Sequence, residues 1–286
     1  MEIYVVKPGD SVDTIAAAYG VLPESVIYNN QLIYPYRLAV GQALLLGEPV
    51  NRQENRYIVV NGYAYTYISP WVLQQTLPYL SELSVFSYGF STGGYLIPPP
   101  MDDVWMVEEA RRYGAVPVLT LTPFGVDGKF NNRLISAVVN NGVAKEQLIT
   151  QLLQVMGEKG YGGLDIDFEY ILAEDRDAFT QFVGEVTQRM NVYGYQVSVA
   201  LAPKTSADQV GLLYEGKDYR GLGEAANQVL LMTYEWGYKY GPNMAVAPIN
   251  MVRKVLDYAV TEIEPAKISL GIPNYGYDWP LPFVRG

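Results

Sequence analysis

The sequence contains neither cysteine nor histidine in its 286 residues. Without cysteine the chain can form no disulfide and offers no thiolate nucleophile, and without histidine it lacks Ser-His triads and the usual zinc ligands. We therefore expect no metal site and no cofactor. Any chemistry must rest on carboxylates and tyrosines, and tyrosine is abundant, at 25 residues. Its flat ring with a polar edge suits the faces of sugars.

Long apolar runs and basic residues are also scarce. No segment approaches the ~20 apolar residues of a membrane helix, and Met1–Tyr4 lacks the basic-then-apolar start of a secretory signal. We expect a soluble protein with no membrane partner and no signal peptide. With 20 basic against 30 acidic residues the formal net charge is -10, which disfavours nucleic acid as a partner. A neutral glycan is a more suitable ligand.

Residues 1–47 have the pattern of a small β-α-α-β unit. Apolar alternation, helical spacing of apolar side chains, a proline suited to a first helical position and a short apolar run follow one another. The predicted elements are a strand over 3–6, a helix capped by Asp10 or Ser11 and ended by Gly20, a helix from Pro23 towards Asn30, and a strand over 43–46.

This unit resembles a LysM domain over nearly its whole length, in the segments Tyr4–Ser11, Ile15–Ala16, Asn30 and Leu38–Leu44. The resemblance implies binding to peptidoglycan or a chitin-like glycan that contains N-acetylglucosamine. A generic capped helical hairpin is the alternative. Residues 48–56 are polar and lack periodicity, so we predict a linker there.

Residues 57–286 alternate short apolar runs with amphipathic helical stretches, at close to the ~30 residues of a βαβ unit. The pattern predicts an α/β domain with a parallel sheet covered by helices, and leaves open whether the sheet is doubly wound or a barrel. The seven predicted strands are 58–60, 84–86, 116–119, 164–168, 197–200, 229–232 and 268–272.

The fourth of these runs carries three acids at alternate positions, Asp165, Asp167 and Glu169. Residues two apart on a strand share a face, so the acids form a column at ~6.6 Å intervals and the apolar residues between them face the other way. Neighbouring buried carboxyls cannot all ionise. We expect Glu169, nearest the carboxyl end, to be the proton donor, kept protonated by Asp165 and Asp167. The alternative is a water-facing strand of an antiparallel sheet, which the flanking helices disfavour.

The same segment resembles the Asp-Gly-x-Asp-x-Asp-x-Glu signature of the family 18 glycoside hydrolases, with Gly162 in place of the first acid. Phe86–Phe90 fits the end of the second strand, and Met232–Trp236 is similar to the family's Met-x-Tyr-Asp, Glu235 replacing the aspartate. The resemblance implies a (β/α)8-type TIM barrel and retaining, substrate-assisted cleavage next to N-acetylglucosamine. Glu169 would protonate the glycosidic oxygen, while Asp167 and Tyr234 would act on the acetamido group.

The LysM-like unit, the barrel and the stretch Gly271–Trp279 together look most like spore peptidoglycan hydrolases of Bacillus-like bacteria, which are cortex-lytic N-acetylglucosaminidases of germination. This resemblance implies a place in the spore coat or cortex, or in the cell wall. The candidate substrate-binding residues, at or just past strand ends, are Tyr65, Tyr88, Glu235, Trp236, Asn274, Tyr275 and Tyr277.

An eighth strand is missing from the pattern, because the sequence stops at Pro280–Gly286, soon after the seventh run. We expect an incomplete or truncated barrel whose first and seventh strands keep unpaired edges. Three other functions stay open: a non-catalytic lectin, a chitinase, and a structural spore-coat protein without sugar contact.

Overall fold

The structure is a computed structural model that describes residues 2–47, 57–125, 127–241 and 243–279. The chain divides into two compact units, Met1–Ile58 and Val59–Gly286, and each has a hydrophobic core of its own. The predicted linker at 48–56 and the segment 280–286 lie outside the described residues. None of the helices in the described ranges has the length and apolar character needed to cross a membrane.

The first unit has the predicted β-α-α-β order. The Ser11 side chain accepts a hydrogen bond from the Thr14 N–H (3.1 Å) and caps the first helix, while Gly20 ends it with a φ of 64°, a backbone conformation that favours glycine. Val26 and Leu44 lie in the core. The elements are β1 Glu2–Val5, α1 Val12–Tyr19, α2 Pro23–Asn29 and β2 Ala43–Leu46, with β1 antiparallel to β2.

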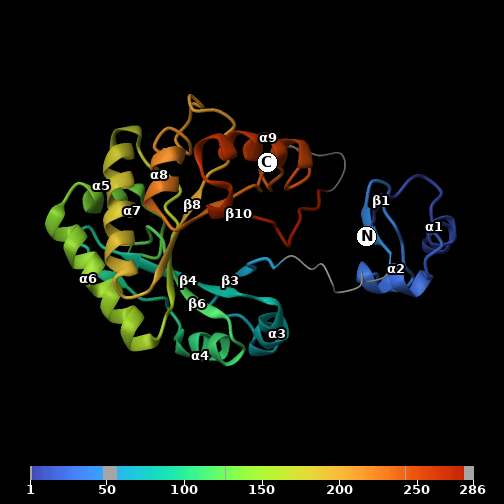
Figure 1. Ribbon diagram of the computed structural model, residues 1–286, viewed down its shortest axis with the longest axis horizontal. Coiled ribbons are helices and arrows are strands. Elements are labelled where there is room, and N and C mark those ends of the chain that lie inside the picture. The colour runs from blue at the N-terminus through green and yellow to red at the C-terminus, as the bar shows by residue number, and fades with distance from the viewer. Residues whose placement is uncertain (1, 48–56, 126, 242, 280–286) are drawn as a thin grey trace. The chain divides into compact units, whose positions relative to one another are not determined.

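The second unit contains one sheet with seven parallel strands (Figure 1). Their spatial order follows the chain in a single direction, which is the winding of a barrel and not of a doubly wound sheet. The strands are β3 Asn61–Tyr65, β4 Glu82–Phe90, β6 Val116–Leu121, β7 Gly163–Ile166, β8 Gln196–Leu201, β9 Gln228–Leu231 and β10 Ile268–Leu270, and the short β5 Leu96–Ile97 pairs antiparallel with the end of β4. Within the described residues the sheet does not close, and β3 and β10 are its edges.

Helices connect the parallel strands and cover the outer face of the sheet (Figure 1). The longest two, α6 and α7, pack their apolar faces, including Leu152 and Phe182, into the same core as the apolar side of β7. The helices of this unit are α3 Pro70–Thr76, α4 Val104–Arg112, α5 Asn132–Val139, α6 Gly142–Lys159, α7 Arg176–Asn191, α8 Tyr219–Ala225 and α9 Ile249–Glu262.

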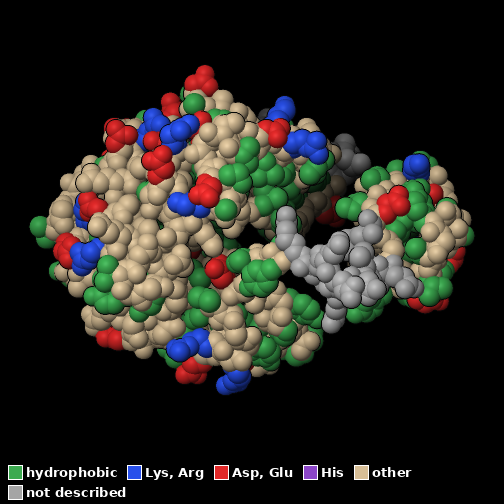
Figure 2. Space-filling view, in the orientation of Figure 1, with side chains coloured by type: hydrophobic (Ala, Val, Ile, Leu, Met, Phe, Trp, Pro, Cys, Tyr) green, Lys and Arg blue, Asp and Glu red, His purple; other side chains and the backbone are tan. Residues whose placement is uncertain are grey.

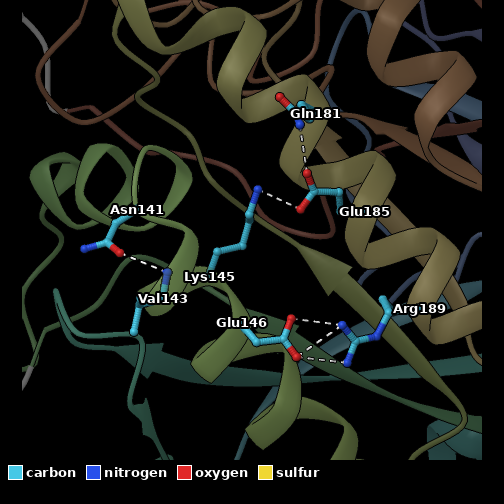
Figure 3. Close-up of polar contacts among 7 residues, drawn as sticks. All are labelled: Asn141, Val143, Lys145, Glu146, Gln181, Glu185 and Arg189. Atoms are coloured by element: carbon cyan, nitrogen blue, oxygen red, sulfur yellow. Dashed lines mark hydrogen bonds and ion pairs between the residues drawn. The ribbon is translucent and has the colours of Figure 1, made fainter.

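Polar contacts link α6 and α7 on their solvent side (Figure 3). Lys145 pairs with Glu185 at 2.7 Å, and Arg189 pairs with Glu146 at 3.0 Å. The Asn141 side chain caps the start of α6 by accepting hydrogen bonds from two backbone N–H groups. Exposed ion pairs of this kind contribute little stability each, so the buried apolar faces, and not these pairs, fix the two helices behind β7.

The predicted first strand is wrong by three residues. The apolar run at 58–60 precedes β3, and Ile58 is 57% exposed. Pairing with β4 decides the position, because it sets Asn61 opposite Glu82 and Tyr65 opposite Phe86. β7 also ends at Ile166, earlier than predicted, although the Asp167 N–H still donates to the Leu121 carbonyl at 2.9 Å.

Charged side chains of both signs are interspersed over the face seen in Figure 2. The excess of acidic residues in the sequence is therefore not gathered into one large field on that face.

Candidate active site

The three acids of the β7 segment point inward, as the alternation predicts. Leu164, Ile166 and Phe168 are fully buried in the core, under the helices. Asp165 lies on the opposite side of the strand and is also fully buried. The water-facing alternative is therefore wrong.

Asp165 accepts hydrogen bonds from two hydroxyl groups, one on the adjacent strand β8 and one on the edge strand β3. Tyr63 on β3 donates to its Oδ2 at 2.9 Å, and Ser198 on β8 donates to its Oδ1 at 2.6 Å. Burial raises the pKa of Asp165 to about 6, although both hydrogen bonds lower it. The ring of Tyr63 is 42% exposed, since β3 is an edge of the described sheet.

Asp167 lies between the other two acids and is influenced by both of them. Burial raises its pKa, and the charges of Asp165 and Glu169 raise it further, while the Lys217 ammonium lowers it. Its Oδ1 is buried and accepts no hydrogen bond from the described residues. Burying a polar atom without a hydrogen-bond partner costs folding free energy. Asp167 Oδ1 is therefore an acceptor that a bound ligand could satisfy.

Glu169 follows β7 and is partly buried. Burial raises its pKa, Lys217 lowers it, and Glu235 raises it again. We predicted that Asp165 and Asp167 would raise the pKa of Glu169. In the structure, burial and Glu235 raise it instead, and the charge of Asp165 raises the pKa of Asp167.

Tyr234, which follows β9, faces these acids. Burial raises its pKa well above the usual range, and the charges of Asp167 and Glu169 add to the effect. Its ring passes close to the chain after β10, where a Cβ on Gly271 would lie 2.6 Å from Tyr234 Cε1. A glycine at position 271 therefore leaves room for the ring.

Three of the predicted binding residues meet at one place. Glu235 accepts hydrogen bonds from the hydroxyls of Tyr275 (2.5 Å) and Tyr277 (3.0 Å). Glu235 has a φ of 67°, which a non-glycine residue adopts only under constraint. Trp236 is partly buried against the core, and Asn274 is exposed beside Tyr275.

Tyr65 is 51% exposed and begins a row of aromatic rings. It stacks on Tyr67, with ring centroids 4.9 Å apart, and meets Phe86 edge-on at 5.1 Å. Phe86, Phe124, Phe130 and Tyr170 continue the row by further ring contacts. The row thus extends from the end of β3 to the residue after Glu169.

Tyr88 does not belong to this surface, and its prediction as a sugar-binding residue is wrong. It is 1% exposed, and its hydroxyl donates to Asp103 at 2.7 Å and accepts from Lys159 at 2.8 Å. A shift in register between Val85 and Tyr88 changes the alternation of β4. The side chain is consequently part of a buried network beside α6.

Sequence reasoning missed Tyr63, Ser198 and Lys217. Ser198 lies at an alternate position of a predicted strand, so the pattern could have found it. Tyr63 was missed because the first strand was placed too early. Lys217 lies in the loop before α8, where no sequence pattern marks it, yet it is fully buried and donates to the carbonyl oxygens of Phe168 and Ala200.

In the described ranges no group of three or more acids is arranged to hold a metal ion.

Together, a parallel barrel-type sheet and a buried acidic column at its carboxyl ends are typical of glycosidases. The profile of the glycosyl hydrolases family 18 matches residues 124–282, and that of the LysM domain matches residues 4–47. The chain therefore belongs to the family 18 glycosyl hydrolases and carries an N-terminal LysM domain.

Among curated proteins, the cortical fragment-lytic enzyme of Bacillus subtilis (strain 168) is 33% identical over an alignment that covers 100% of this chain and 78% of the relative. The putative sporulation-specific glycosylase YdhD of the same strain is 31% identical, over 66% of its length. The crystal structure of the Bacillus cereus spore cortex-lytic enzyme SleL matches with a TM-score of 0.78 at 32% identity, covering 99% of this chain and 65% of that one. The chain thus spans about two thirds of the length of this solved relative.

Proposed function

We propose that the protein hydrolyses β-1,4 glycosidic bonds next to N-acetylglucosamine in spore cortex peptidoglycan, with retention at the anomeric carbon. The observation that carries the proposal is the buried column Asp165, Asp167 and Glu169, close enough to Tyr234 to raise its pKa, at the carboxyl ends of a barrel-type sheet. The cortex as substrate is supported by the names of the relatives from Bacillus subtilis and Bacillus cereus.

In the proposed reaction the substrate's acetamido group is the nucleophile, a route that family 18 uses in place of a second enzymic carboxylate. Glu169 gives its proton to the glycosidic oxygen as the bond from that oxygen to the anomeric carbon breaks. The acetamido carbonyl oxygen forms the new bond to that carbon, giving an oxazolinium ion. Water, losing a proton to Glu169, then attacks the same carbon and reopens the ring, so both displacements together retain the configuration.

The free acceptor on Asp167 supports this role. Its buried Oδ1 has no hydrogen-bond partner in the described chain, and an acetamido N–H is a donor that would satisfy it. The Tyr234 hydroxyl, kept protonated by burial and by the nearby acids, would donate to the acetamido oxygen. Glucose polymers lack this group and should be poor substrates.

The aromatic row and the Glu235 cluster are the proposed sugar-binding surfaces. The exposed ring of Tyr65 lies at one end of the row, and Tyr275 and Tyr277 are oriented by Glu235. Aromatic faces of this kind pack against sugar rings. The LysM domain would retain the protein on the glycan, in the spore or the cell wall.

The test is cleavage of cortex fragments, N-acetylglucosamine oligomers and cellulose oligomers, followed by mass spectrometry of the products and NMR of the newly formed anomer. Glu169→Gln keeps the shape but removes the acid, so turnover should fall at least ~10²-fold. Glu108→Gln, an exposed change on α4, is the matched control and should leave turnover unchanged. Faster cleavage of N-acetylglucosamine oligomers than of cortex would make the protein a chitinase instead.

A non-catalytic lectin is the second candidate, because exposed aromatic rings such as Tyr65 can hold a sugar without cleaving it. In that case the wild type and Glu169→Gln would bind cortex fragments equally well, and neither would release shorter sugars. Detection of cleavage products with the wild type alone excludes the lectin.

A further inference from the structure

Lys217 is the least expected side chain near the acids. It is fully buried, and burying an ammonium group is costly unless it is paired or hydrogen-bonded. None of the ion pairs found in the described chain involves it. Its charge is met by two backbone carbonyls and, at longer range, by Asp167 and Glu169.

The carbonyls that Lys217 contacts place it directly behind the catalytic segment. Phe168, whose carbonyl accepts from Nζ, is the residue between Asp167 and Glu169. Ala200, at 3.1 Å, belongs to the neighbouring strand β8. One ammonium group thus bridges the end of β7 to β8, where β7 no longer makes its full ladder of hydrogen bonds.

The loop before α8 is built to bring Lys217 to this position. A Cβ on Gly216 would lie 2.4 Å from the Ile171 carbonyl oxygen, so only glycine allows the loop to approach the segment after Glu169 so closely. The Lys217 carbonyl in turn accepts from the ammonium of Lys204, which is 3.1 Å away and itself buried. Two buried lysines therefore share one loop, but only Lys217 is directed at the acids.

We infer that Lys217 is a positioning residue of the proposed hydrolase: it fixes the Phe168 peptide, and so the direction of Asp167 and Glu169, and its charge sets how many protons the acidic column holds. The inference rests on the proposed function for its consequence in catalysis. The predicted number of protons on the acids is independent of the proposed function, because it is a property of the protein without substrate.

The direction of the effect follows from the charges around the pair. Lys217 lowers the pKa of Asp167 and of Glu169, and among the described residues it is the only cation that acts on them. The other titratable groups facing these two acids are Asp165, Tyr63, Tyr65, Tyr170, Tyr234 and Glu235. All are neutral or anionic, so removal of the cation should shift both pKa values upward.

The experiment is an infrared titration of the buried carboxyl groups of the full chain, with Asp167→Asn and Glu169→Gln used to assign the bands. In Lys217→Met the midpoints of Asp167 and Glu169 should rise by about one pH unit. Lys217→Gln keeps an N–H donor for the carbonyls but no charge, so it should show the same rise and decides the question if Lys217→Met fails to fold.

Lys204→Met is the matched control, because Lys204 is equally a buried lysine of this loop but is influenced by Asp218 and Glu262 and not by the catalytic acids. In Lys204→Met the titration midpoints of Asp167 and Glu169 should stay at the wild-type values, even if the variant is less stable. Wild-type midpoints in both Lys217 variants, or an equal rise in Lys204→Met, would overturn the inference.

Activity gives a second, separate readout. If the wild type cleaves glycan, both limbs of its kcat/KM profile against pH should move to higher pH in Lys217→Gln, since a deprotonated Asp167 and a protonated Glu169 are both required. If the wild type cleaves nothing, the proposed function fails, and the infrared titration still decides the role of Lys217.

Discussion

Asp165 makes only two hydrogen bonds in a fully buried position, and its stability contribution should depend on pH. Its pKa is about 6 in the folded protein, raised from the ordinary aspartate value of 3.8. Between pH 3.8 and about pH 6 this carboxyl group is ionised in the unfolded chain but still protonated in the folded protein. Rising pH therefore lowers the free energy of unfolding, and this loss of stability is complete above the folded pKa. A difference of about two units corresponds to about 3 kcal/mol.

We therefore predict that Asp165→Asn gains about 3 kcal/mol of stability relative to wild type between pH 4 and pH 7, measured by urea unfolding at each pH. Asp103 is the matched control with the opposite sign. Burial opposes its ionisation, but hydrogen bonds from Lys159, Tyr161 and Tyr88 prevail and lower its pKa. Asp103→Asn should lose stability relative to wild type as pH rises. A flat difference for Asp165→Asn would contradict the assigned pKa.

The acids themselves could be predicted from the sequence, because alternation along one strand is a local rule. Asp165, Asp167 and Glu169 needed only a two-residue period and flanking helices. The hydrogen-bond partners could not be predicted, since Tyr63 and Lys217 reach the column across long sequence distances. The prediction that Tyr88 binds sugar was wrong for a related reason. A shift in the pairing of β4 with β6 places its ring on the other side of the sheet.

At the scale of elements, the approach of the loop before α8 to the segment after β7 depends on Gly216. Gly216→Ala would place a methyl group 2.4 Å from the Ile171 carbonyl oxygen, and the atoms there belong largely to the backbone and cannot easily move. We predict a loss of about 1–3 kcal/mol of stability and a fall in kcat/KM, because Lys217 moves with the loop.

Gly142→Ala, at the start of α6, is the matched control for this change. Beyond its chain neighbours and its own helix backbone, the added methyl group would meet open space, so stability should stay equal or rise by up to about 1 kcal/mol. Chemical unfolding of both variants checks the pair. Equal stability of the two would mean that the loop can relax away from Ile171 without cost.

The order of strands and helices was predictable to a larger degree than their ends. Six of the seven parallel strands overlap an apolar run in the sequence, whereas the first predicted run, 58–60, ends just before β3. The ends of β3 and β7 were misplaced because pairing with a neighbour, and not hydrophobicity, decides them: the apolar residues at 58–60 remain largely exposed, while the less apolar Asn61–Tyr65 forms the strand.

At the scale of the whole molecule, the LysM domain and the family 18 domain have separate cores. The core of the LysM domain is complete within itself and includes Val12, Ile15, Val26 and Leu44. In the part of the chain that the structure describes, the acidic column and its hydrogen-bond partners all belong to the second unit. Binding to an insoluble glycan and cleavage of a bond in it should therefore be separable.

We predict that residues 57–286 alone cleave short soluble oligomers with the kcat/KM of the full chain, since every group of the proposed site is retained. Their retention on insoluble cortex should fall by roughly 10²-fold, because two linked binding sites hold a polymer more tightly than one. Sedimentation with purified cortex measures the second quantity, and product release from oligomers measures the first. Loss of both together would show that the LysM domain contributes to the catalytic site, whereas unchanged retention would show that the family 18 domain binds the polymer on its own.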